Sequence, residues 1–144
     1  MIPAPGPDSA PYTILYRSDL DLAVLRWQRE NTFPELKASY AELLALAQHH
    51  GCARWLLDGR REGAISRPVT VWLTNVFFPY AVAALAPRPL RLGVFTSPAR
   101  LTQMHADAAV AEEVRHALAL GQPYQAGVFI DEGEALRWLT FLPQ

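Results

Sequence analysis

The stretch ARWLLDGRREGAIS, residues 53–66, decides the fold class. Its first six residues are mostly apolar and end in Asp58, and Gly59 follows, a pattern typical of a strand buried on both faces of a sheet. A polar loop comes next, and Pro68 then stands where the first turn of a helix tolerates a residue without an N–H group. A buried strand followed by a helix predicts a parallel crossover, and hence an α/β fold.

Hydrophobic periodicity and turn residues divide the rest of the chain into further strands and helices. The other expected strands are a hairpin of two runs before this stretch and two single runs after it: 13–16, 22–27, 89–96 and 125–130. The other expected helices cover 34–50, a short segment from Ser97-Pro98 onward, 107–120 and 135–142. The predicted order is β-β-α-β-α-β-α-β-α, a mixed sheet in a single domain over residues 12–144.

The first eleven residues contain four prolines and have no cationic start followed by an apolar run. Proline has no N–H group to donate to a neighbouring strand and disrupts a helix interior. A secretory signal needs a cationic start followed by an apolar run. We therefore expect residues 1–11 to be a flexible leader and not a signal peptide.

Several helix ends are marked by capping residues. Thr32 and Glu35 have the spacing of a capping box, and Gly51 supplies a left-handed residue after the helix that it ends. Asp131 and Glu134 repeat the capping-box spacing before the last helix. These signals predict where the first and last helices begin.

The helix expected over 68–85 carries more large apolar side chains than one buried stripe requires. Core packing alone would explain them, but a share of the face around Trp72, Phe77 and Phe78 could also line a ligand cavity or contact an identical subunit. Pro79 is expected to kink or break this helix near Phe78. Asn75, Pro79 and the short length argue against a membrane span.

The composition narrows the classes of function. With 144 residues, 51% of them hydrophobic, the chain has enough apolar material for one compact core. A formal net charge of −1 leaves no basic surplus for nucleic acid or an anionic membrane. The single cysteine, Cys52, excludes an internal disulfide, so we expect a reducing cytoplasm. The histidines have no spacing that resembles a metal site, and no phosphate-cradling or dinucleotide motif occurs.

Three segments resemble the STAS superfamily (sulfate transporter and anti-sigma factor antagonist domains), in particular its stage II sporulation protein AA-like branch. They are ARWLLDGR at 53–60, LRLGVFTS at 90–97 and FIDEGEALRWL at 129–139, and the resemblance extends over 12–142. It implies a bacterial protein with helices mostly on one side of the sheet, without metal or redox cofactor, that binds a protein or a small ligand and has no chemistry of its own. Related STAS-like folds include lipid carriers.

In the antagonists of this family, a serine at the start of the second helix is phosphorylated. Here Ser66 stands just before the predicted helix, where a phosphate would meet free backbone N–H groups, so it is the phosphorylation candidate. Ser66 also suits a simple helix cap. Asp58 would end its strand at the sheet edge where α/β proteins bind ligands, with Arg60 and Arg61 beside it. A salt bridge that holds the loop is the alternative for this group.

These observations favour a non-enzymatic, cytoplasmic STAS-like module that binds a protein partner or itself through the 58–66 loop and the following helix. The second hypothesis is a carrier or sensor of a small apolar, lipid-like ligand held between the aromatic helix and the sheet. A hydrolase built on Ser66 lacks the glycines of a nucleophile elbow, so we expect no enzyme activity, no catalytic residue and no cofactor.

Overall fold

The structure is a computed structural model that describes residues 10–141, and side chains through residue 140. Residues 1–9 of the expected leader and residue 142 of the expected last helix lie outside the described residues. The described chain folds around a five-stranded mixed sheet with interleaved helices, as the sequence predicts. The strands are β1 (Tyr12–Arg17), β2 (Leu22–Trp27), β3 (Arg54–Asp58), β4 (Arg91–Phe95) and β5 (Gln125–Phe129).

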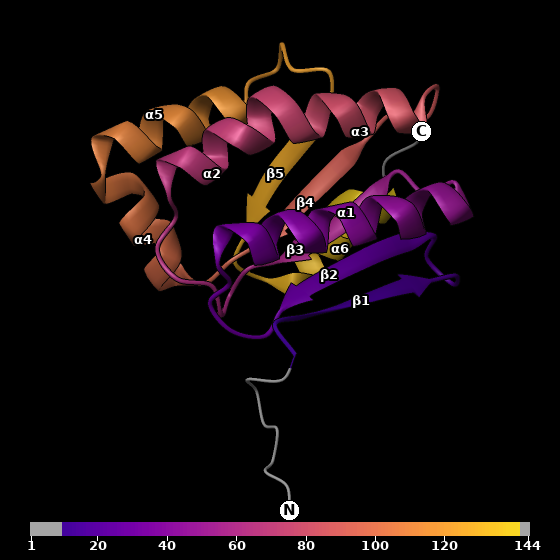
Figure 1. Cartoon of the computed structure of the whole chain (residues 1–144), viewed down its shortest axis with the longest axis horizontal. Helices are drawn as coiled ribbons and strands as arrows, with labels where there is room; N and C mark the ends of the chain where they lie inside the picture. Colours follow the sequence, from indigo (N-terminus) through magenta and orange to yellow (C-terminus); the bar gives the residue numbers. More distant parts are fainter. Residues whose placement is uncertain (1–9, 142–144) are drawn as a thin grey trace, which may run out of the picture.

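The strand order in space equals the order along the chain, β1-β2-β3-β4-β5, with β1 antiparallel to β2 and every later pair parallel. Each crossover therefore leads to the next strand on the same side of the sheet. Because such connections are right-handed, the crossover helices all lie on one face. These are α1 (Phe33–His50), α2 (Arg67–Trp72), a π-helical turn η2 (Leu73–Phe77), α3 (Phe78–Leu85), α4 (Pro98–Ala106) and α5 (Ala108–Ala117). The last helix, α6 (Glu132–Phe141), covers the opposite face (Figure 1).

Alternation along the buried strands creates two cores. Trp55 and Leu57 of β3 face α1 and α3, whereas Leu56 between them faces α6. All three side chains are at most 2% exposed, which is the pattern expected for a strand covered on both faces. On the other face, Gly93 allows α6 to approach β4 closely, because a Cβ atom on residue 93 would lie 2.8 Å from Leu139 Cδ1.

The expected caps are largely confirmed. Thr32 and Glu35 form a complete capping box, with Thr32 Oγ1 accepting from the Glu35 N–H at 3.2 Å and Glu35 Oε1 accepting from the Thr32 N–H at 2.9 Å. Gly51 ends α1 in the left-handed conformation, at φ 62°. Asp131 Oδ1 accepts from the backbone N–H of Gly133 at 2.8 Å.

Pro79 is expected to kink or break the second helix near Phe78, and the regular α-helix is interrupted there by a π-helical turn, although the chain stays helical. The chain runs from α2 through η2 into α3, and Pro79 occupies the first turn of α3. The widened turn explains this outcome, because the Phe78 N–H bonds to the Leu73 carbonyl five residues back. A π turn just before proline relieves the clash with the carbonyl four residues earlier, so the helix continues.

The combined helix, Arg67–Leu85, is long and apolar enough to cross a membrane by length and composition alone. The length of this helix therefore gives no argument against a membrane span. In this fold the helix packs on the sheet and on α1 and α5, and 33% of the span is buried.

Candidate functional site

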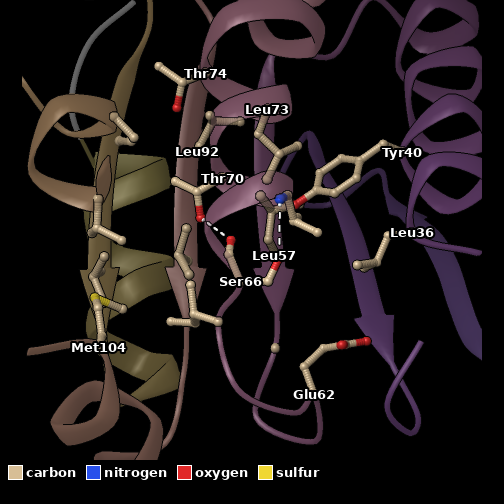
Figure 2. A pocket seen from close by; sticks show the side chains of 18 of the residues that line it. Leu36, Tyr40, Leu57, Glu62, Ser66, Thr70, Leu73, Thr74, Leu92 and Met104 are labelled. Atoms are coloured by element: carbon tan, nitrogen blue, oxygen red, sulfur yellow. Dashed lines mark hydrogen bonds between the residues drawn. The ribbon is translucent and has the colours of Figure 1, made fainter. Parts of the chain in front are cut away.

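A partly enclosed cavity of about 470 Å³ lies between the crossover helices and the sheet. Its floor is the helix-covered face of β3, β4 and β5, and its walls come from α1, α2, η2, α4 and α5 (Figure 2). Apolar side chains make up most of the lining: Phe33, Leu36, Leu57, Ile65, Val69, Leu73, Phe78, Leu92, Val94, Met104, Val114, Leu118 and Val128. This is the kind of surface that receives a small apolar molecule.

The sheet places the floor residues by simple alternation. Leu92 and Val94 are two apart on β4, so both side chains point to the same face as Leu57 on β3. Val94 is only half-buried although β4 lies between β3 and β5, and Val128 on the edge strand β5 is half-buried too. Their exposed surface faces the cavity, which is therefore a real gap in the packing of this face.

One end of the cavity is polar. Glu62, at the lower end in Figure 2, accepts from the Asn31 backbone N–H at 3.2 Å, and burial raises the pKa of its carboxyl group. Glu30 lies beside it, over Gly63, where an added Cβ atom would be 2.8 Å from either carboxylate oxygen. Arg100 reaches the same end from α4, and its Nε donates to the Gly63 carbonyl at 3.0 Å.

Buried polar groups also face the cavity from its sides. Tyr40 is 4% exposed, its hydroxyl points into the cavity, and burial raises its pKa (Figure 2). Asn31 is 7% exposed, and its Oδ1 has no hydrogen-bond partner among the described residues. A buried acceptor without a donor is rare in folded proteins.

The structure places Asp58 and Arg60 on the other face of the sheet. Asp58 accepts from Arg60 Nε at 3.0 Å, from Arg60 Nη2 at 2.9 Å and from Arg26 Nη1 at 2.7 Å. Arg26 continues to Glu132 at the start of α6, at 3.1 Å. Burial raises the pKa of Asp58, but the hydrogen bonds from Arg60 and Arg26 outweigh it and hold the pKa below its usual value. This is the geometry of a salt bridge that holds a loop.

Ser66 lines the cavity and caps α2, because its Oγ accepts from the Val69 N–H at 3.2 Å. The arginines near it in sequence point to other partners. Arg61 Nη1 donates to Gln28 Oε1 at 2.7 Å, and Arg67 lies 3.9 Å from Glu113. The fold thus separates Ser66 from the Asp58–Arg60 pair that the sequence places beside it.

The three aromatic candidates also separate. Phe78 lines the cavity, whereas Trp72 and Phe77 pack beside it in an aromatic cluster around Tyr40. Trp72 and Phe77 stack with ring centroids 5.4 Å apart. Sequence reasoning missed Glu30, Asn31, Tyr40 and Arg100, which come from three segments, the β2–α1 loop, α1 and α4, and belong to no motif.

Fold and site together define a single-domain α/β protein whose cavity lies between the crossover helices and the sheet, with its polar end beyond the carboxyl ends of β2, β3 and β4. No family model matches the chain, and neither a curated protein nor a solved structure does. Within the described residues, no group of three His, Cys, Asp or Glu side chains could hold a metal ion.

Proposed function

We propose that this protein binds and releases a small, largely apolar molecule in the cavity between α2 and the sheet, as a carrier or sensor. The observation that carries the proposal is the gap of about 470 Å³ lined mostly by apolar side chains. Ligand cavities measure roughly 300–1,000 Å³ and combine an apolar lining with a few polar groups. The sequence hypothesis of an apolar ligand next to the aromatic helix is thereby favoured over the protein-binding hypothesis.

The test uses N-phenyl-1-naphthylamine, an uncharged apolar dye that fluoresces when it leaves water. We expect saturable binding by the wild-type protein, and a loss of at least about tenfold in affinity for Val94→Phe, because the larger ring fills the cavity floor. Val76→Phe is the matched control, since Val76 is 56% exposed on the outer side of η2. Equal binding by all three proteins, or none by the wild type, would contradict the proposal.

Native mass spectrometry of the protein, purified without denaturation, provides a second readout. A retained molecule that leaves on unfolding would identify the natural ligand directly. The spectrum also reports the number of subunits.

The STAS-like regulatory module that binds a protein partner, or itself, is the second proposal. The exposed side of the combined helix supports it, because Val76 is 56% and Tyr80 is 66% exposed. Exposed large apolar side chains on one helix are typical of interaction surfaces. Val76→Asp should then abolish self-association in sedimentation, or capture of a partner, without lowering dye binding; unchanged association would contradict this proposal.

A further inference from the structure

The balance of hydrogen-bond donors and acceptors at the polar end of the cavity indicates what the apolar molecule carries. Acceptors dominate there: the carboxylates of Glu30 and Glu62 and the Oδ1 atom of Asn31. Arg100 is the opposing charge in the described lining, so the carboxylates outnumber cations two to one. The end is therefore acidic in sum.

The side-chain amide of Asn31 cannot turn to give its Oδ1 atom a hydrogen-bond donor. Its Nδ2 donates to the Arg29 carbonyl at 2.7 Å and to the Pro11 carbonyl at 3.0 Å, which fixes the orientation of the amide. Exchanging the positions of Oδ1 and Nδ2 would break both bonds. The Oδ1 atom therefore stays buried without a donor among the described residues.

Arg100 is held by acceptors of the protein itself. Its Nε donates to the Gly63 carbonyl at 3.0 Å and its Nη1 to Thr96 Oγ1 at 2.9 Å. A Cβ atom on Gly59 would lie 3.0 Å from Nη1, so the guanidinium also packs closely against the β3–α2 loop. These bonds assign Arg100 to bracing that loop.

We propose that the ligand is an apolar amine, with its ammonium group at the polar end formed by Glu30, Asn31 and Glu62 and its apolar part over Leu92 and Val94. The proposal rests on the cavity-binding function above. An ammonium supplies three donors and a positive charge, which matches the two carboxylates of the lining. The Tyr40 hydroxyl can donate or accept, so it is compatible with this head group.

The experiment displaces the bound dye near neutral pH with three molecules that share one tail: octylamine, octanol and octanoate. The amine is a cation and octanoate an anion under these conditions. We expect octylamine to compete at about tenfold lower concentration than octanol, and octanoate to be the weakest, because a charge-assisted hydrogen bond is worth about that factor. Octanoate competing as well as octylamine would overturn the amine assignment while leaving the cavity proposal intact.

Two variants then locate the recognition. Glu62→Gln and Glu30→Gln should each reduce the advantage of octylamine over octanol, whereas octanol itself competes as before. Glu112→Gln on α5 is the matched control, because it removes the same charge from a side chain that is 69% exposed. An amine advantage that survives both cavity variants would refute the role of these carboxylates. If the wild type binds no dye and none of the three molecules shifts its melting temperature, the cavity proposal and this one both fail.

Discussion

Replacing Asp58 by asparagine should destabilise the protein by about 2 kcal/mol without affecting the cavity. The carboxylate is 6% exposed and accepts charge-assisted bonds from Arg60 and Arg26. Removing one partner of a fully buried pair costs about 3–5 kcal/mol. Here the two arginine side chains are 45% and 33% exposed, so water compensates part of the loss. Arg26 also keeps Glu132, at 3.1 Å, which limits the cost further.

The assay is urea unfolding followed by circular dichroism, at neutral pH and at a series of acidic pH values. The folded pKa of Asp58 lies below its unfolded value, so its contribution to stability is complete above the unfolded pKa, about 3.9. It is lost as the pH falls through the folded pKa. The difference in unfolding free energy between wild type and Asp58→Asn should therefore shrink only in acid, below about pH 4.

Asp19→Asn is the matched control, because Asp19 pairs with Arg17 in a turn where its side chain is 62% exposed. It should change the free energy of unfolding by less than about 0.5 kcal/mol. A similarly small effect of Asp58→Asn at neutral pH would refute the structural role of the pair. Loss of dye binding by Asp58→Asn would refute its separation from the cavity by the sheet.

Two further substitutions test the aromatic cluster and the polar end. Phe77→Ala should lower the free energy of unfolding in urea by about 3–5 kcal/mol, because Phe77 is 6% exposed. Dye binding should survive in the folded fraction, since Phe77 lies outside the cavity lining. A loss of stability below about 1 kcal/mol would contradict core packing. Gly63→Ala places a Cβ atom 2.6 Å from Glu30 Cδ, and because that carboxylate ends a flexible side chain, it should move at little cost in stability. We expect the melting temperature to stay nearly unchanged while octylamine loses part of its advantage over octanol; an unchanged advantage would contradict the role of Glu30.

Local signals predicted the elements well. The two ends of α1 follow from residues at most a few positions apart, namely the capping box of Thr32 and Glu35 and the left-handed Gly51. Local sequence therefore predicts where α1 begins and ends. Ser66 as the cap of α2 follows for the same reason. The length and burial of β3 could be predicted because a continuous apolar run requires cover on both faces.

Other features depended on how the backbone accommodates its neighbours. The π turn that lets Pro79 remain in a helix is one of them, because the sequence shows the proline but not the relief of its clash. The hydrogen-bond partners of Asp58 are a second such feature. Arg60 is two residues away and was foreseen, but Arg26 meets Asp58 only because β2 and β3 pair in the sheet, and Glu132 of α6 bonds to Arg26.

The sequence by itself determined the order of strands and helices, the single mixed sheet and the caps, because hydrophobic period and capping act over a few residues. Only the tertiary structure decided which polar residues meet at the cavity. Glu30, Glu62 and Arg100 come from three separate segments, and a contact between distant segments depends on the packing of helices on the sheet. The same packing placed Asp58 and Ser66 on opposite faces of the sheet: Asp58 alternates with Leu57 along β3 and points toward α6, whereas Ser66 caps α2 on the cavity side.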